Sequence, residues 1–282
     1  GTRLAMTVMR DDPTLVRAAV LDSALPPEVL RINETAANAE QALDSLFADC
    51  AADPVCAATY PDLAETFDAL LAQAAAQPIV IPGADALGGA QSLQLDPAGV
   101  IIAAVWGLHI SDYIPALPYA ITALQQGDVT SLNPVAAIFA SAAPDMSSVV
   151  NLAITCHEQI LPTSADALNA SFDAHPRTAA FGRLHVFGDA ATGIAVCQAL
   201  GLSAATEAEL QPLKTELPSL ILAGALDPTT PADYGRQAAH ESSRSAFVLW
   251  QEAGHAVSVG PDARCAQSII SQFLTDPAAR LD

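Results

Sequence analysis

The sequence predicts an α/β fold in which a partial parallel sheet is interrupted by a large, mostly helical insertion. A short apolar segment near the start has the length of a buried strand, and a long Ala- and Leu-rich stretch with helical spacing follows it. Near the end come an apolar run, a helix and a second apolar run, an order that indicates parallel strands joined by a crossover helix. With 282 residues and 51% hydrophobic content, the chain can bury a substantial core.

Residues 1–25 predict one helix and one strand of the core. From Thr2 to Arg10, apolar residues such as Leu4 recur at the spacing of one helix face. Pro13 closes the turn that follows, and Ala18 to Leu21 form a short apolar run typical of a buried strand. Because a lone strand cannot form a sheet by itself, we expect most of the sheet to lie outside this chain.

Residues 26–205 predict a mostly helical block, which we call the helical block. Prolines interrupt it, and each of them ends or begins a helix because it lacks an N–H group. These residues are Pro54, Pro61, Pro78, Pro97, Pro118, Pro134 and Pro144. Extended segments at Ile79 to Pro82 and Ser92 to Leu95 predict a small hairpin within the block. No fixed-period repeat is visible, so a solenoid is not predicted.

Residues 206–282 predict the second piece of the core. Leu217 to Ala223 and Ala246 to Trp250 are apolar runs with the length of buried strands, and Pro231 to Ala239 predicts a helix between them. A closing helix is expected from Ala263 to Leu274. Two parallel strands therefore follow the helical block and are expected to join the strand that precedes it.

The charge balance excludes one class of partner. Eleven Lys and Arg residues stand against 31 Asp and Glu residues, which leaves a formal net charge of -20. Such a surface repels a phosphate backbone, so no nucleic acid partner is expected, and an anionic membrane is scarcely better. We interpret the acidic balance as the surface of a secreted or salt-adapted protein, with attraction of cationic substrates as the alternative.

No transmembrane helix is predicted. The longest apolar run, Val100 to Trp106, can be extended only to Ile110, well short of the roughly 20 residues that span a bilayer. The sequence begins with Gly1 rather than Met and has no basic-then-apolar signal segment. We expect either that a leader has been removed or that the sequence begins within a longer gene.

Five cysteines favour disulfides over a metal site, because none of them forms the C-x-x-C spacing of zinc or thioredoxin-type sites. Cys50 and Cys56 bracket a short polar loop and could close a local bridge, in which case Cys156 and Cys197 would close a longer one. Cys265 is left over, and we expect its partner outside the chain. Disulfides indicate a secreted or periplasmic protein. No metal and no cofactor are expected.

Two residues with acid–base chemistry follow the predicted strands of residues 206–282. Asp227 comes after the first strand and His255 after the second, so both are expected at the edge where active sites of open α/β sheets collect. A carboxylate that orients an imidazole prepares it to take a proton from a hydroxyl group. Taken singly, an Asp before Pro is also typical of a turn cap. The other histidines are expected to be block or surface residues: His109, His157, His175, His185 and His240.

No G-x-S-x-G motif occurs in the chain, but its opening is similar to the segment that comes directly after such a motif. Gly1 to Ala5, Val20 to Ser23, the Asp227 loop and the Gly254-His255 loop resemble the tripeptidyl aminopeptidase and proline iminopeptidase-like branch of the α/β hydrolases. The resemblance implies an α/β-hydrolase fold whose lid is the helical block. It also implies that Gly1 is the last glycine of Gly-x-Ser-Tyr-Gly, so that the nucleophilic serine lies two positions before Gly1.

The resemblance extends over nearly the whole chain. Four more segments match the family in order: Cys50 to Cys56, Leu117 to Asp128, Ile154 to Glu158 and Cys265 to Pro277. It implies that Glu158 holds the free amino terminus of a peptide, with a solvated helix residue as the alternative interpretation. Asp22 is interpreted as a simple strand-end residue.

The predicted function is that of a C-terminal fragment of a secreted serine hydrolase. We expect an exopeptidase that cleaves near the free N-terminus of peptides, with Asp227 and His255 completing a triad. A carboxylesterase acting on small esters is the alternative with the same fold, and a non-catalytic binding module is the alternative if the chain is complete. The chain by itself is expected to be inactive, and a monomer is expected.

Overall fold

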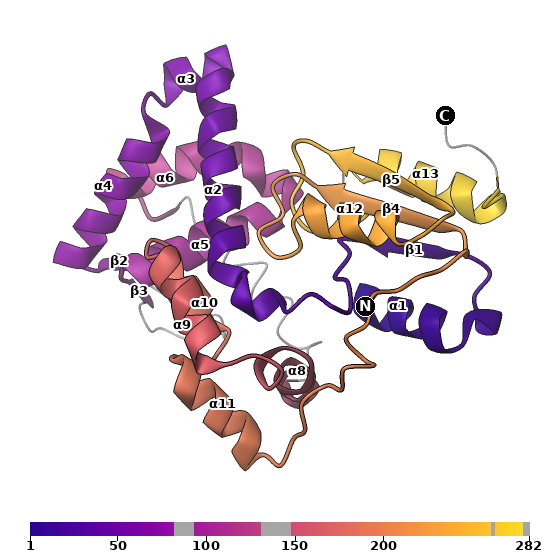
Figure 1. Ribbon diagram of the computed structural model, residues 1–282. Coiled ribbons are helices and arrows are strands. Elements are labelled where there is room, and N and C mark those ends of the chain that lie inside the picture. Colours follow the sequence, from indigo (N-terminus) through magenta and orange to yellow (C-terminus); the bar gives the residue numbers. More distant parts are fainter. Residues whose placement is uncertain (82–92, 131–147, 261–262, 279–282) are drawn as a thin grey trace.

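The computed structural model describes residues 1–81, 93–130, 148–260 and 263–278 (Figure 1). In Figure 1, the helical block lies on one side of the molecule and a small sheet with its helices lies on the other. The prolines expected to break helices at 134 and 144 lie outside the described residues.

Three parallel strands form the sheet, in the order β1-β4-β5. These are β1 (Ala19–Asp22), β4 (Ser219–Gly224) and β5 (Ser245–Trp250). Every residue of the central strand β4 is buried, which explains why it is apolar along its length rather than alternating. The strand that precedes the helical block thus pairs directly with one that follows it, as the sequence predicts.

Helices cover both faces of the sheet. Met6 and Met9 of α1 (Thr2–Asp11) pack with Ile221, and α12 (Ala232–His240) lies against the same face. On the opposite face, α13 (Arg264–Thr275) packs against Leu220 and Leu222. Side chains of β5 belong to the apolar clusters on both faces. Because successive strand residues point to opposite faces, this alternation buries both sides of the sheet.

The described segments between β1 and β4 are mostly helical. They are η2 (Arg31–Asn33), α2 (Thr35–Ala52), α3 (Pro54–Thr59), α4 (Leu63–Ala76), α5 (Pro97–His109), η3 (Ser111–Ala116), α6 (Leu117–Gln125), α8 (Ser148–Thr155), the π-helical turn η6 (Cys156–Ile160), α9 (Ala165–Ala174), α10 (Ala179–Leu184) and α11 (Ala190–Ala199). A further short helix, η1 (Pro13–Leu15), precedes β1. Three of the prolines act as the sequence predicts, since α3, α5 and α6 each carry Pro in the first turn.

The expected hairpin is present as a pair of short antiparallel strands. β2 (Ile79–Ile81) pairs with β3 (Leu93–Leu95), with Ile79 opposite Leu95. The residues between the two strands, including Pro82 and Ser92 of the predicted segments, lie outside the described residues.

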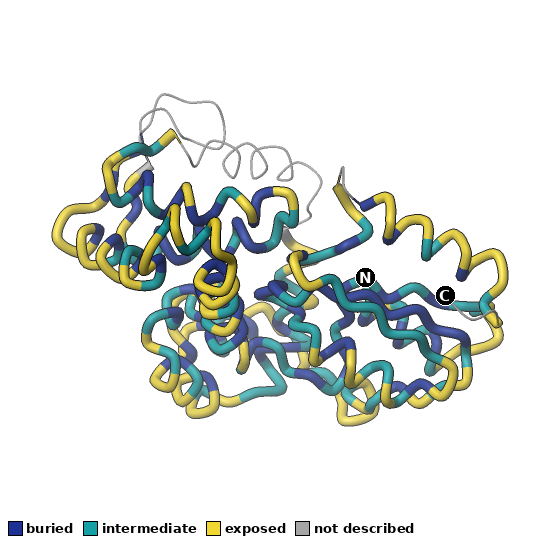
Figure 2. Tube along the Cα trace, turned by 90° about the horizontal axis from the view of Figure 1, so that it is seen from above, coloured by how far each residue is buried: buried dark blue, intermediate teal, exposed yellow. Residues whose placement is uncertain are grey.

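Two apolar cores stabilise the helical block. The larger joins α2, α4, α5 and α6 around side chains such as Phe67 and Leu108, which are fully buried. The smaller surrounds Ile160 and Phe172 and contains a disulfide. Figure 2 shows buried residues in the middle of the sheet and along the inward-facing sides of the helices, whereas β5 at the sheet edge is intermediate in burial.

Both disulfides predicted from the spacing are present. Cys50–Cys56 joins α2 to α3, and Cys156–Cys197 joins η6 to α11. Cys265 is a free, exposed thiol on α13. No described helix combines the length and the apolar character that crossing a bilayer requires.

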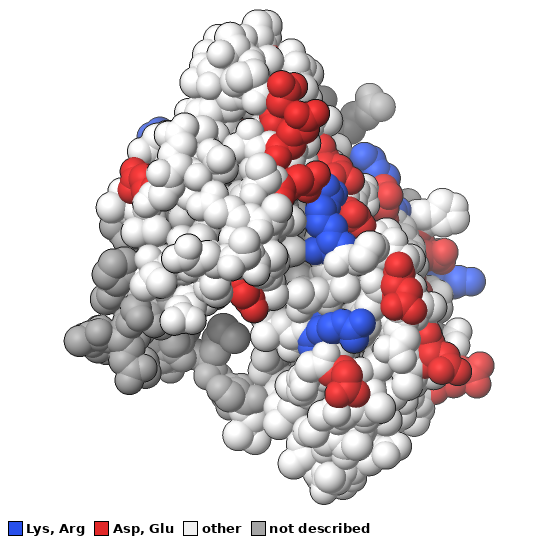
Figure 3. Space-filling view, turned by 90° about the vertical axis from the view of Figure 1, so that its left-hand side faces the viewer, with Lys and Arg blue, Asp and Glu red and all other residues white. Residues whose placement is uncertain are grey.

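Acidic side chains are spread over the surface. On the face shown in Figure 3, they lie close to most of the Lys and Arg side chains that are visible there. Arg177, for example, pairs with both Glu40 and Asp44. Among the described residues, four of the eleven basic side chains form ion pairs with carboxylates, namely Arg3, Arg10, Arg177 and Arg236.

Candidate active site

Asp227 and His255 lie in contact at the carboxyl edge of the sheet. Asp227 follows β4 and His255 follows β5, and the Nδ1 atom of His255 lies 2.8 Å from Oδ2 of Asp227. The neighbouring parallel strands bring the two loops together, because their carboxyl ends meet at one edge. The structure therefore joins the two residues that the sequence singles out.

The carboxylate of Asp227 is fully enclosed and fully hydrogen-bonded. It is 2% exposed. Its Oδ1 accepts from the backbone N–H groups of Thr229 and Thr230 at 2.8 and 2.9 Å, and its Oδ2 accepts from the Thr230 hydroxyl at 2.7 Å. Burial alone would raise the pKa of Asp227, but the hydrogen bond and charge of His255 and the Thr230 donors lower it below its usual value. Asp227 is consequently an anion at neutral pH.

His255 is held in the tautomer that a general base needs. Its Nδ1–H donates to Asp227, so Nε2 is left to accept a proton. Burial lowers the pKa of His255, but the hydrogen bond and the charge of Asp227 outweigh it, and the net effect is a raised pKa. The pair can therefore take up a proton and stabilise the resulting imidazolium, as the acid–base half of a catalytic triad must do.

The segment after His255 is anchored to the end of β1. Asp22 accepts hydrogen bonds from the backbone N–H groups of Val257 and Ser258 at 3.1 and 2.9 Å, and from the Ser258 hydroxyl at 2.5 Å. The sequence interpretation of Asp22 as a simple strand-end residue misses this role. Its carboxylate positions the His255 loop from a strand more than two hundred residues away in the chain.

Two residues beside His255 have left-handed backbone conformations although neither is glycine. Ser23 has φ 60° and Ala256 has φ 61°, and the Ser23 hydroxyl accepts a hydrogen bond from the Ala256 N–H at 2.9 Å. Such conformations cost on the order of 1 kcal/mol or more and persist where the surroundings enforce them. The strained turns indicate that this edge is built to hold His255 in one place.

Glycine is required where the two loops cross and where they meet the helical block. A Cβ atom on Gly224 would lie 2.1 Å from the carbonyl oxygen of Gly254, and one on Gly254 would lie 1.8 Å from the carbonyl oxygen of Leu108. The N–H of Gly254 also donates to Ser111 Oγ at 3.1 Å. The C-terminal end of α5 is thus packed directly against the His255 loop.

His109 lies in the helical block, as expected, but it also lies beside His255, which the sequence does not indicate. It ends α5, and its ring centroid lies 5.5 Å from that of His255. Nδ1 lies 3.1 Å from the Val105 carbonyl oxygen and Nε2 lies 2.5 Å from the Thr229 hydroxyl. Burial lowers the pKa of His109 to about 4, so the ring is neutral beside His255. No local pattern marks His109, because its role depends on how α5 packs.

The other four histidines do not contact Asp227 or His255 among the described residues. Their partners are Ser203 and Glu209 for His157, Glu40 for His175, the Phe181 carbonyl for His185, and Glu241 for His240. For these residues the expectation of a block or surface position holds. Within the part of the chain that is described, no cluster of three or more His, Cys, Asp and Glu side chains could hold a metal ion.

The start of α1 lies against the same strand end. Thr2 Oγ1 donates to the Ser23 carbonyl oxygen at 3.4 Å and accepts from the Leu25 N–H at 3.1 Å. Since Ser23 also holds Ala256, the first turn of α1 and the His255 loop share one anchor.

Glu158 lies at the same end of α1 but not in contact with the pair. Its Oε2 lies 3.1 Å from Nε of Arg3, and its side chain is 32% exposed. Arg3 also donates to the carbonyl oxygens of Pro27 and Val29 at 2.6 and 3.3 Å. The ion pair joins η6 of the helical block to the first turn of α1.

Comparison with known proteins points to the same chemistry. Residues 185–280 match the model of a family described as TAP-like protein, a range that includes β4, β5, Asp227 and His255. Among curated proteins, none matches the chain. Residues 185–280 therefore resemble the TAP-like family of α/β hydrolases.

Proposed function

We propose that this chain is the C-terminal part of a serine hydrolase whose nucleophile stands two positions before Gly1. The observation that carries the proposal is the shared anchor at Ser23, which ties the first turn of α1 to the loop of His255. A residue just ahead of α1 would stand beside the His255 ring. The family match of residues 185–280, which include Asp227 and His255, supports the assignment as a hydrolase.

The chemistry then follows from the geometry of the pair. The serine hydroxyl gives its proton to Nε2 of His255 while its oxygen attacks the carbonyl carbon of the substrate. The buried charge of Asp227 stabilises the imidazolium that forms. His255 returns the proton to the leaving amine or alcohol, and a water molecule activated in the same way releases the acid from the acyl-enzyme.

The oxyanion that forms in this reaction needs backbone donors. The residue after the serine would supply one N–H at the amino end of α1, where the helix dipole also favours negative charge. The second N–H would come from a loop ahead of Gly1.

The finer proposal is an exopeptidase in which the helical block, residues 26–205, covers the site as a lid. Glu158 lies at the first turn of α1, close to the proposed serine, and is exposed enough to receive a substrate amine. The ion pair with Arg3 offsets part of its charge, so a substrate amine would share the carboxylate with Arg3. The two disulfides support an exported protein. An esterase would use the same triad without Glu158.

The first experiment is to sequence the DNA upstream of Gly1 and to express the longer chain that it encodes. We expect a serine two positions before Gly1 that is labelled by a fluorophosphonate probe. The variant His255→Ala should lose the labelling, whereas His240→Ala, on the exposed end of α12, should keep it. A different residue at that position, or labelling that survives His255→Ala, would contradict the proposal.

A second experiment tests the exopeptidase assignment with the Glu158→Gln variant of the longer chain. Cleavage of peptides with a free amino terminus should fall about tenfold or more, because a charge-assisted contact to the amine is lost. Esters and N-acetylated peptides should be spared, and Glu207→Gln, an exposed surface change, serves as the control. Equal losses on both substrate classes would remove the amine-binding role of Glu158.

A further inference from the structure

The end of α5 contacts both loops of the acid–base pair. His109, the last residue of this helix, contacts the Asp227 loop, and Ser111, the first residue of η3, contacts the His255 loop. Both residues belong to the helical block, whereas the two loops leave strands of the sheet. One short segment of the block therefore reaches both members of the pair.

The contact of His109 leads to the carboxylate of Asp227 through a single residue. Nδ1 of His109 faces the Val105 carbonyl oxygen at 3.1 Å, so this nitrogen carries the proton and Nε2 is left as an acceptor. The Thr229 hydroxyl, 2.5 Å from Nε2, is then the donor. The backbone N–H of the same threonine donates to Oδ1 of Asp227 at 2.8 Å. The position of Thr229 thus sets one of the hydrogen bonds that hold the carboxylate.

The ring of His109 also packs beside the ring of His255. The two ring centroids lie 5.5 Å apart, and the His109 ring contacts Trp106 of the same helix, with centroids 4.6 Å apart. Because burial lowers the pKa of His109 to about 4, its ring is uncharged at neutral pH. An uncharged ring can lie beside His255 without repelling the imidazolium that forms there during the reaction.

The contact of Ser111 acts on the other loop. Its Oγ accepts a hydrogen bond at 3.1 Å from the N–H of Gly254, the residue directly before His255. The same glycine lies so close to α5 that a Cβ atom on it would be 1.8 Å from the Leu108 carbonyl oxygen. The backbone ahead of His255 therefore has little room to move while α5 stays in place.

The larger core of the helical block holds α5 itself. Val105 and Leu108 are fully buried in that core. Leu226, directly before Asp227, is buried in the same core, so the Asp227 loop also has an apolar attachment to the block. Since a close-packed core transmits strain rather than absorbing it, the position of α5 is passed on to both loops.

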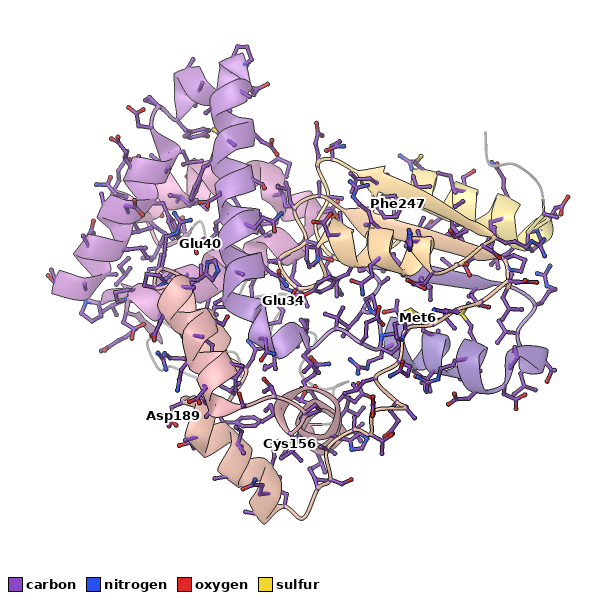
Figure 4. The ribbon with its side chains drawn as sticks, viewed as in Figure 1. Met6, Glu34, Glu40, Cys156, Asp189 and Phe247 are labelled. Atoms are coloured by element: carbon purple, nitrogen blue, oxygen red, sulfur yellow. A yellow bond between two sulfur atoms is a disulfide. The ribbon has the colours of Figure 1, made fainter. Side chains whose placement is uncertain are left out.

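A second contact between the helical block and the sheet region does not involve the pair. The Tyr234 hydroxyl of α12 donates to Glu34 at 2.6 Å and accepts from Asn38 at 2.9 Å. Figure 4 shows Glu34 at the base of α2, where the block meets the sheet region. In the described part of the chain, Tyr234 forms no hydrogen bond with Asp227 or His255. This contact joins the two regions without orienting the pair.

We propose that His109 and Ser111 are positioning residues for the reaction, which hold the Asp227 and His255 loops in the arrangement that proton transfer needs. The inference rests on the proposed function and gives the helical block a second role besides covering the site. Neither residue touches the reacting atoms, and each acts through one loop of the pair. A displacement of about 1 Å can lower a rate on the order of 100-fold, so a small shift of α5 is sufficient.

Kinetics of the longer chain test the hydrogen bond between His109 and Thr229 from both ends. His109→Phe keeps a ring beside His255 but removes the acceptor, and Thr229→Val removes the donor. Each variant should lower kcat about 10- to 100-fold with little change in KM. Because both remove one bond, the double variant should lose no more than either single variant. His109→Gln, whose amide oxygen can accept from Thr229, should restore part of the rate.

A second measurement does not depend on activity. In the longer chain with its proposed serine replaced by alanine, NMR titration of the His255 ring gives its pKa. The hydrogen bond and the charge of Asp227 raise this pKa, so we expect His109→Phe and Ser111→Ala each to lower it by loosening the pair. The charges of Asp22 and Arg31, which also act on the His255 pKa, are unchanged in these variants.

Two control variants remove comparable contacts away from the pair. Tyr234→Phe removes the other contact between the two regions. His185→Phe replaces a second half-buried histidine, which follows α10 and has Nδ1 2.9 Å from the Phe181 carbonyl oxygen. Both should lower the melting temperature but leave kcat and the His255 pKa unchanged. The circular dichroism spectrum of each variant shows whether it is folded.

An unchanged kcat and an unchanged His255 pKa in folded His109→Phe and Ser111→Ala would overturn the inference. Losses of the same size in Tyr234→Phe would also overturn it, because any contact between the two regions would then have this effect. Failure of the proposed function looks different. In that case the longer chain would hydrolyse no substrate, while the His255 pKa would still fall in the two variants.

Discussion

Different interactions stabilise the sheet edge at His255 and the helical block. At the edge, hydrogen bonds join loops that are far apart in the sequence, and Asp22, Ser23 and Asp227 accept nearly all of them. In the block, helices pack through apolar side chains such as Phe67 and Phe172, and two disulfides reinforce them. We therefore expect substitutions at the sheet edge mainly to lower the rate of hydrolysis, and substitutions in the helical block mainly to lower the free energy of unfolding.

The largest expected effect is at the edge, in Asp227→Asn of the longer chain. An amide can stabilise the wrong tautomer of His255 and cannot stabilise its imidazolium, so kcat should fall about 10⁴-fold. The measurement is kcat/KM against pH. In the wild type, activity should rise with pH through a pKa above 6.5, because His255 must lose its proton to act as a base. Asp233→Asn on α12 is the control, and a loss below tenfold would contradict the assigned role.

The two disulfides provide the sharpest test in the block. From the loop that each bridge closes, replacing Cys156 and Cys197 by serine should cost about 4 kcal/mol, and replacing Cys50 and Cys56 about 2 kcal/mol. Urea unfolding of the two double variants measures the difference. The reverse order would mean that strain or residual structure in the unfolded chain, rather than loop closure, dominates.

Lowering the pH should destabilise the contact between the helical block and the sheet edge at His255 before it destabilises other parts of the protein. His109 and His185 have pKa values of about 4 in the folded protein, below the ordinary 6.5. Between these values the unfolded chain binds protons that the folded protein does not, so the free energy of unfolding falls as pH drops from about 6.5 to about 4. The loss has an upper bound of about 3 kcal/mol per histidine. Urea titrations at several pH values measure it, and His109→Gln should flatten the curve; an unchanged slope would contradict the neutral state of His109.

The smallest predicted effect concerns the strand-end anchor. The Asp22 carboxylate accepts three hydrogen bonds, and Asp22→Asn replaces one of its accepting oxygens by an NH₂ group, which cannot accept them. We therefore expect the free energy of unfolding to fall by about 1–2 kcal/mol. Hydrogen exchange at the N–H groups of Val257 and Ser258 should speed up. Asp68→Asn, an exposed change on α4, is the control. Unchanged exchange would show that the loop is held by other contacts.

The elements that the sequence predicted well are those with a local cause. Apolar runs of strand length placed β4 and β5, and residues that follow such strands, Asp227 and His255, were found because parallel strands end at a common edge. The Cys50–Cys56 bridge was predicted because the two cysteines bracket a short loop, and Cys156–Cys197 followed as the hypothesis for the second pair. His109 could not be found this way, since it reaches the site only through the packing of the helical block. The anchoring role of Asp22 depends on Val257 and Ser258, near the other end of the chain.

The pairing of β1 with β4 also has a consequence for how the protein folds. Ala19 pairs with Ser219, so β1 and β4 can pair only when the chain of about two hundred residues between them forms a closed loop. Closing so long a loop of flexible chain is entropically costly, whereas the contacts between neighbouring helices of the block are local in sequence. Folding is therefore expected to begin in the helices, whose compaction shortens the distance between the strands. The triad pair, the strained turns and the contact with α5 would form in the last and slowest step.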